Sequence, residues 1–262
     1  MAPDFNSYKF LLNLQEASMK NDKSPLVAAN KQPSHTLFVL SNAVADRKEN
    51  FVKWYTQSYH QSIVQLDNVL SAQHYTRHEI DITHGSFPGP SYQYLGVYEL
   101  CLDGAGQAQE IINTITQSHQ QESSAELPAT WLYFPISEKV GRSPEITDPM
   151  IALAFANGLP GSESEFREWY CTQHMRHALH IPVFASGQCL ERTGFQDPGV
   201  VSPDYSLICF YQWDGTPQDY FNFLESLSED EGQELTDLIA FPAMDSERFG
   251  EAVYKPITKK LY

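Results

Sequence analysis

The chain has 262 residues and a formal net charge of −16; 42% of its residues are hydrophobic and 13% aromatic. This apolar content is enough for a packed core and argues against global disorder. The acidic excess argues against nucleic acid and anionic membranes as partners, because both attract basic patches. No apolar run reaches membrane-spanning length, and the four cysteines lack metal-type spacing, so we expect a cytoplasmic protein without disulfides.

An internal repeat organises the sequence. The run Phe51-Val52-Lys53-Trp54-Tyr55 recurs as Phe166-Arg167-Glu168-Trp169-Tyr170 at an offset of 115 residues. Other positions align at the same or a nearly equal offset: Asn42 with Asn157, Ser71 with Ser186, Gln73 with Gln188, His74 with Cys189, Arg77 with Arg192, Glu99 with Gln212 and Lys139 with Lys260. Units of this length are too long for solenoid repeats and indicate a duplicated small domain.

The pattern predicts the following elements in chain order. Residues 1–33 form an N-terminal extension outside the repeat, with a short amphipathic helix at 5–19. The first half, 34–140, has strands at 37–41, 71–82, 92–102 and 130–136, and helices around Trp54 and at 107–118. A linker at 141–149 leads to the second half, 150–262, with a first strand from Ile151, a helix around Trp169, strands at 186–193, 205–213 and 251–257, and a helix at 218–227.

Each half therefore has the order βαββαβ of a ferredoxin-like unit. The antiparallel sheet of such a unit has helices on one face and leaves the other face apolar and in need of a cover. We expect the two fused halves to supply that cover for each other. The predicted fold is α+β, with two ferredoxin-like halves whose sheets pack into a pseudo-dimeric α/β barrel.

The repeated helix carries the main candidates for catalysis. Phe166, Tyr170 and His174 share one helix face with Trp169, and such a face is normally buried. A buried histidine needs a partner or a ligand, so His174 is a candidate general acid or base beside Tyr170, with Trp169 as a substrate contact. The alternative is a core histidine bonded to a backbone carbonyl.

The first half differs at the aligned positions. Tyr59 takes the place of His174, and His60 follows one residue later, a rotation of about 100° that would move it off the buried stripe. Tyr59 and His60 are therefore candidates for a specialised or silent first-half site. The further candidates for substrate binding are Trp54, Tyr55, Asn42, Asn157, His74, Arg192 and, in a Gly/Pro-rich loop, His84.

Simpler interpretations compete with three of these residues. Asn42 and Asn157 could each form an Asx turn at a strand end, and Arg192 could pair with Glu191. His174, His177 and His180 have a spacing that can bring two imidazoles to a metal, but no nearby carboxylate or cysteine completes a ligand set. We therefore expect no metal and no other cofactor.

The motif Trp169-Tyr170-Cys171-Thr172-Gln173-His174, followed by Ile181-Pro182, resembles the EthD-like branch of the dimeric α/β-barrel superfamily, here as a tandem duplication in one chain. The first half departs from this signature at Tyr59. The resemblance implies a cofactor-independent lyase, decarboxylase, isomerase or monooxygenase acting on a small apolar, aromatic or polyketide-like carbonyl compound. A non-catalytic binding protein for a hydrophobic metabolite, a haem-binding barrel protein, and a homo-oligomer of the pseudo-dimeric chain stay open.

Overall fold

The structure is a computed structural model that describes residues 32–83, 86–87, 89–194, 205–239 and 241–262. The description below concerns the unit Pro33–Tyr262. The strands are β1 (His35–Ser41), β2 (Val69–Arg77), β3 (Tyr94–Leu100), β4 (Ala129–Pro135), β5 (Val140–Gly141), β6 (Met150–Ala156), β7 (Phe184–Arg192), β8 (Leu207–Trp213) and β9 (Gly250–Pro256). The helices are α2 (Lys48–Trp54), η1 (Tyr55–Tyr59), α3 (His60–Val64), α4 (Ala105–Gln121), α5 (Glu163–Trp169), η2 (Tyr170–His174), α6 (Met175–Ala178), α7 (Pro217–Ser226), α8 (Glu229–Ile239) and η3 (Ser246–Arg248).

Eight of the strands close into an antiparallel barrel. Their order is β4-β1-β3-β2-β9-β6-β8-β7, and β4 pairs again with β7. The two joins between the halves have matching registers, because Tyr133 lies opposite Arg192 and Tyr254 lies opposite Arg77. Strand β5 adds to β7 beside the closed ring. The predicted α+β class and antiparallel barrel are thus confirmed.

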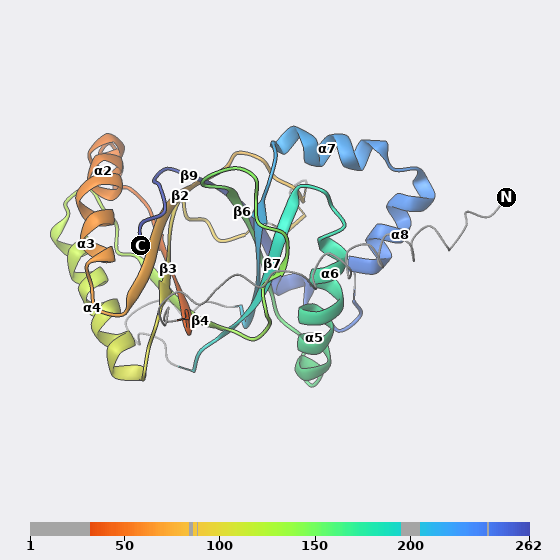
Figure 1. The fold of residues 1–262 in the computed structure, drawn as a ribbon, viewed down its shortest axis with the longest axis horizontal. Coiled ribbons are helices and arrows are strands. Elements are labelled where there is room, and N and C mark those ends of the chain that lie inside the picture. The colour runs from red at the N-terminus through yellow and green to blue at the C-terminus, as the bar shows by residue number, and fades with distance from the viewer. Residues whose placement is uncertain (1–31, 84–85, 88, 195–204, 240) are drawn as a thin grey trace, which may run out of the picture. The chain divides into compact units, whose positions relative to one another are not determined.

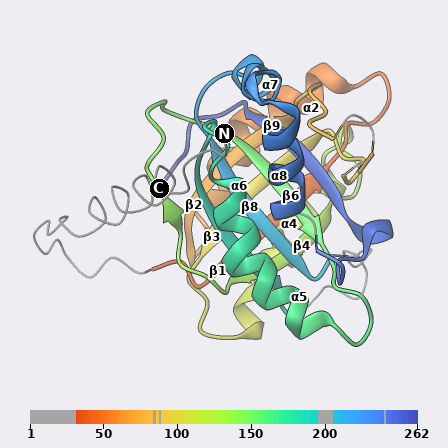
Figure 2. The same cartoon turned by 90° about the vertical axis from the view of Figure 1, so that its right-hand side faces the viewer.

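Helices cover the barrel on two opposite sides (Figure 1). The run α2-η1-α3 and helix α4 lie on one side, and α5 to α8 lie on the other; Figure 2 shows α5 and α6 in front of strands β6 and β8. Three apolar cores result: one inside the barrel, centred on residues such as Phe155, and one in each layer between sheet and helices. Among the described residues, no helix is long and apolar enough to cross a membrane.

The repeated helix is interrupted at the same place in both halves. A π-helical turn, η1 or η2, follows directly after Trp54 and after Trp169. Single π turns inside helices are rare and occur frequently at functional sites. The capping boxes that the spacings Asp46-x-x-Glu49 and Ser162-x-x-Glu165 suggest are not formed, because neither helix has a side-chain hydrogen bond at its N-cap.

Candidate functional site

The π turn of the first half buries both Tyr59 and His60. Both side chains are less than 5% exposed. The His60 Nε2 atom lies 3.0 Å from the Ala72 carbonyl oxygen in β2, so that nitrogen donates. The expected rotation of His60 off the buried face is therefore wrong. That expectation used regular α-helical geometry, whereas the wider π turn accommodates two consecutive residues against the sheet.

His74 lies at the centre of this layer and is fully buried. Its Nδ1 atom is 2.9 Å from the Tyr55 carbonyl oxygen, and its Nε2 atom is 2.8 Å from the Tyr98 hydroxyl. A carbonyl oxygen only accepts, so Nδ1 carries the proton and Nε2 accepts from Tyr98. Burial, and then the charge of His60, lowers the pKa of His74 well below its usual value. The imidazole is therefore neutral at pH 7, and its Nε2 lone pair faces the Tyr98 hydroxyl.

A second buried imidazole, His119 of α4, lies near this cluster. Its Nδ1 donates to the Ile115 carbonyl at 3.0 Å, and its Nε2 accepts from the Ser41 hydroxyl at 3.0 Å. Burial lowers the pKa of His119 to about 4. The edge of its ring faces the rings of Trp54 and Tyr59, with centroids 5.1 and 4.9 Å apart. Three histidines, His60, His74 and His119, thus surround the tyrosines of the π turn.

Two signature residues of the first half, Trp54 and Tyr59, line an open pocket at the surface. A space of about 310 Å³ between α2-η1-α3 and α4 is bounded by the stacked rings of Trp54 and Tyr59, whose centroids are 4.5 Å apart, and by Ser58, Ser62, Ser118, Gln121 and Glu122. The Tyr59 ring stacks in turn on Tyr55, and the hydroxyls of both are buried and have no hydrogen-bond partner among the described atoms. The nearby Tyr98 hydroxyl lowers the pKa of Tyr59 against the larger effect of burial. The two hydroxyl groups are nevertheless not oriented to form a hydrogen bond with each other. Unpartnered buried hydroxyls often mark a place for a water or ligand oxygen.

The second half brings its signature residues together in a filled layer. The Tyr170 hydroxyl donates to the Ala154 carbonyl at 3.0 Å, and the ring of His174 stacks on Tyr170 at 4.8 Å. Trp169 lies 5.1 Å from His174 and stacks on Phe241 at 4.6 Å. His174 does not line the pocket near Tyr59, the cavity at the barrel end or the pocket near Leu132. The geometry around His174 is that of a packed aromatic core.

The two layers also differ in the strand residues under the π turn. Cys189 takes the position aligned with His74, and its sulfur lies 3.3 Å from that of Cys209 on the neighbouring strand. Burial comes first among the causes that raise the pKa of Cys189. A buried thiol with a raised pKa is a poor nucleophile at neutral pH. The second half therefore lacks the imidazole–phenol pair of the first.

The sequence analysis did not single out Glu251, a carboxyl group of β9 in the second half. Burial, and then the charge of Asp81, raises its pKa to about 7. Its charge also raises the pKa values of Tyr170 and Tyr211, which places it near those phenols. The only sequence signal is an acid at the start of the apolar run Ala252-Val253-Tyr254, a weak pattern because strands commonly have one polar face.

The remaining predicted binding residues lie at strand ends. The Oδ1 atoms of Asn42 and Asn157 accept from the backbone N–H groups of Gln93 and Ser206 at 2.9 and 2.8 Å. Asn157 also donates to the Arg248 carbonyl at 3.2 Å. These contacts brace loops in both halves.

Arg192 and His84 complete the list of predicted binding residues. Arg192 is the last residue of β7 and lies opposite Tyr133 of β4. Burial raises the pKa of Tyr133, and the charge of Arg192 offsets part of this rise. Glu191, the partner considered for Arg192, instead pairs with Arg167 at 2.8 Å. His84 lies outside the described residues. Among the described residues, no three His, Cys, Asp or Glu side chains are grouped to hold a metal ion.

Gly96 of β3 provides a test of the phenol position. A Cβ atom there would overlap the hydroxyl end of Tyr98, with its Cζ only 2.7 Å away. We expect Gly96→Ala to displace Tyr98 from His74 and to lower the free energy of unfolding by about 2 kcal/mol, as overpacking does. Urea unfolding measures this change. Gly106→Ala in α4 is the matched control, since nothing lies within 4 Å of its Cβ; equal effects of the two variants would contradict the packing described.

Comparison with known proteins finds similarity at the level of structure. No family model matches the sequence, and no curated protein matches it. An anthrone oxidase-like protein superposes with a TM-score of 0.56 at 9% identity, covering 90% of this chain and 95% of the other. A protein assigned as a monooxygenase from Fusobacterium nucleatum subsp. nucleatum gives a TM-score of 0.51 at 10% identity, covering 86% and 93%. A chlorite dismutase variant from Candidatus Nitrospira defluvii gives 0.52 at 9% identity, covering 87% and 93%.

These chains match this one over most of its length and share its helix-covered antiparallel barrel. At such low identity the similarity concerns the fold and not the chemistry. The chain has the fold of the dimeric α/β-barrel proteins.

Proposed function

We propose that the chain is a cofactor-independent enzyme that moves a proton on a small aromatic or polyketide-like carbonyl compound, and that its active site lies in the first half. The observation that carries the proposal is the pocket lined by Trp54 and Tyr59, where Tyr59 joins it to a buried layer that holds two unpartnered tyrosine hydroxyls and the neutral His74. A flat ligand would replace one ring of the Trp54–Tyr59 stack, as aromatic side chains favour. The name of one structural neighbour, an anthrone oxidase-like protein, agrees with such a ligand.

The groups beneath the cavity have complementary roles in this proposal. The hydroxyls of Tyr55 and Tyr59 would donate to the ligand carbonyl oxygen and stabilise the negative charge that develops on it. Once the ligand has entered the layer behind Tyr59, a proton leaving the adjacent carbon would pass to the buried Tyr98 oxygen as the Tyr98 proton moves to His74 Nε2, leaving an enolate and an imidazolium. An enolate is common to isomerisation, dehydration and cofactor-free oxygenation.

We further infer that 34–140 and 150–262 are duplicated ferredoxin-like units joined by the linker 141–149, and that only the first kept these groups. Two observations support the duplication. The first and third strands of each half pair in the same antiparallel way, as β1–β3 and as β6–β8, and a π turn follows Trp54 in one half and Trp169 in the other. His174, aligned with Tyr59, remains the candidate acid or base if the second half is active.

Haem does not fit beside His74 or His174 as the two layers are packed. Both ring nitrogens of His74 are hydrogen-bonded, to Tyr55 and to Tyr98. The ring of His174 is covered by Tyr170 and lies beside Trp169. Axial ligation needs an imidazole that faces an apolar space large enough for the macrocycle. Neither imidazole meets that requirement.

The test compares single substitutions on a panel of anthrones, aromatic ketones and aromatic β-keto acids, with oxygen uptake and mass spectrometry as readouts. We expect Tyr59→Phe to lower turnover at least tenfold. The same change should leave stability unchanged or raised, because the deleted hydroxyl has no partner. Tyr254→Phe is the matched control, since it deletes another unpartnered hydroxyl inside the barrel.

Two results would contradict the proposal. Turnover lost in His174→Asn but kept in Tyr59→Phe would place the active site in the second half. Saturable binding of panel compounds by the wild type without turnover would identify a binding protein instead.

A further inference from the structure

A second cavity lies inside the barrel, away from both helix layers. It has a volume of about 90 Å³, and strands of both halves contribute its walls. Its polar wall contains Gln73, Glu99, Lys139, Gln188, Gln212 and Lys260. The rest of the barrel interior is an apolar core that includes Leu153 and Phe155. The polar groups therefore gather at one end of the barrel, where β3 and β8 end.

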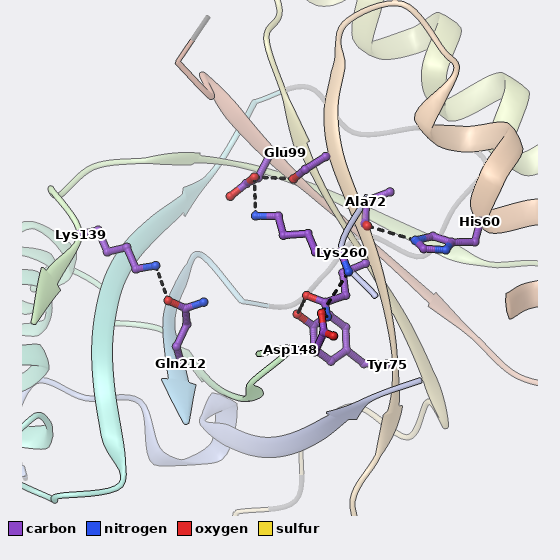
Figure 3. Close-up of polar contacts among 10 residues, drawn as sticks. His60, Ala72, Tyr75, Glu99, Lys139, Asp148, Gln212 and Lys260 are labelled. Carbon is purple, nitrogen blue, oxygen red and sulfur yellow. Dashed lines mark hydrogen bonds and ion pairs between the residues drawn. The ribbon is translucent and has the colours of Figure 1, made fainter. Parts of the chain in front are cut away.

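The polar wall consists of two arms that the internal repeat relates. In one arm, Glu99 accepts from the Ser71 hydroxyl and, at 2.7 Å, from Lys260 Nζ. In the other arm, Gln212 accepts from the Ser186 hydroxyl at 3.0 Å and from Lys139 Nζ. Figure 3 shows the pair Lys139–Gln212 across from the pair Lys260–Glu99. Each hydrogen bond in one arm thus joins two residues, and the repeat aligns these residues with the two that are joined in the other arm.

The glutamines behind the lysines repeat the same arrangement. Gln73 Nε2 donates to the Thr258 carbonyl and Gln188 Nε2 to the Ser137 carbonyl, both at 3.2 Å. Gln73 also donates to Asp148 at 3.0 Å, and Asp148 accepts from the Lys260 backbone N–H at 3.1 Å. These bonds fix the segments that carry the two lysines to the barrel end. The lysines are thereby positioned by the fold.

The arms differ at one position, and this difference changes the charge. Glu99 neutralises Lys260, whereas the aligned Gln212 offers Lys139 only a neutral amide oxygen. Although Lys139 is exposed at the rim, loss of water contacts and the charge of Lys260 both lower its pKa. The lining of the cavity therefore carries two ammonium groups and one carboxylate, and a second carboxylate, Asp148, lies behind Gln73, which donates to it. Of the two lysines, Lys139 is the one whose hydrogen-bond partner at the cavity carries no charge.

The apolar part of the lining limits the kind of anion. Val97, Leu190 and Phe210 form it, and each lies two residues along its strand from a polar lining residue and on the same face. A water needs about 10–15 Å³ of such space, so the cavity holds several water-sized groups and no large ligand. We propose that this cavity binds a short alkyl carboxylate, with its carboxylate group at Lys139 and its alkyl chain against Val97, Leu190 and Phe210. An inorganic oxyanion would satisfy the lysine but not the apolar wall.

The experiment is a titration of the full chain with sodium butyrate, followed by saturation-transfer NMR and calorimetry at constant chloride ionic strength. We expect saturable binding that Gln212→Glu weakens at least tenfold, because the new carboxylate would neutralise Lys139 as Glu99 neutralises Lys260. Lys139→Met should weaken binding similarly, and Glu99→Gln should bind at least as tightly as the wild type. Acetate should bind roughly tenfold more weakly than butyrate because it buries two fewer methylene groups.

The control is Lys53→Met on the exposed face of α2, which changes the net charge as Lys139→Met does. Thermal melting shows that each variant is folded. Equal butyrate affinity in the wild type and in folded Gln212→Glu would overturn the proposal. So would an equal loss in Lys53→Met, which would show a general charge effect, or phosphate binding as tightly as butyrate, which would remove the role of the apolar wall.

Discussion

Replacing Glu251 by glutamine is expected to stabilise the fold at pH 8 by about 3 kcal/mol and to change it little at pH 4. The reason is the pKa of this carboxyl group, which burial and then Asp81 raise from 4.5 to about 7. Below pH 4.5 the group is protonated in both the folded and unfolded states, so its contribution to folding stability is fully present. As the pH rises through 7, the unfolded state has already lost the proton that the folded state retains, and stability falls.

Urea unfolding of the wild type and Glu251→Gln between pH 4 and pH 8 measures this difference. Glu168→Gln on the exposed face of α5 controls for the loss of one negative charge. Asp81→Asn should reproduce part of the effect, since Asp81 is the second cause of the raised pKa. A constant difference between wild type and Glu251→Gln over this pH range would show that the carboxyl group is not held in its protonated form by the fold.

Replacing His119 by glutamine is expected to have the opposite pH dependence. Burial lowers the pKa of His119 from 6.5 to about 4, so its contribution is fully present above pH 6.5 and is lost as the pH falls toward 4. Over that pH range the free energy of unfolding should fall by about 3 kcal/mol more for the wild type than for His119→Gln. At pH 7 the variant should be less stable by about 1–2 kcal/mol, because its amide cannot hold both the Ser41 and the Ile115 contacts.

Proton NMR of the imidazole tests the same statement directly. The His119 signal should show no titration between pH 8 and pH 5 while the chain stays folded. Titration near pH 6.5 in the folded protein would contradict the buried, neutral imidazole described here. The parallel loss of the His119–Trp54 edge contact in His119→Gln could be followed by tryptophan fluorescence.

Much of the fold could be predicted from the sequence because it depends on local signals. Alternating apolar residues mark the strands, the Phe-x-x-Trp-Tyr runs mark the two helices, and the repeat predicts that one half resembles the other. The strands and first helices form close to the predicted positions. The π turns were not predicted, because a single extra residue per turn leaves no mark in an amphipathic pattern.

The candidate site was less predictable. Trp54, Tyr55, Tyr59, His60 and His74 were candidates from the repeat and from their residue types, and the structure brings them together in one layer. Their catalytic roles remain predictions, as does that of His174. Tyr98 and His119 were not singled out, since a tyrosine in a strand and a histidine in a helix are common. Only their positions beside His74 and Tyr59 distinguish them.

The sequence by itself determined the duplicated pattern, the barrel and the helix that carries the signature, since hydrophobic periodicity acts over neighbouring residues. The tertiary structure alone decided the cavity near Tyr59, the neutral state of His74 and the uneven charge at Lys139. These depend on side chains far apart in the chain that meet in the fold, as Ser41 and His119 do in a buried layer and Lys139 and Gln212 do at the barrel end. Packing sets that distance and that dielectric environment, and both decide which groups ionise and which are left without a partner.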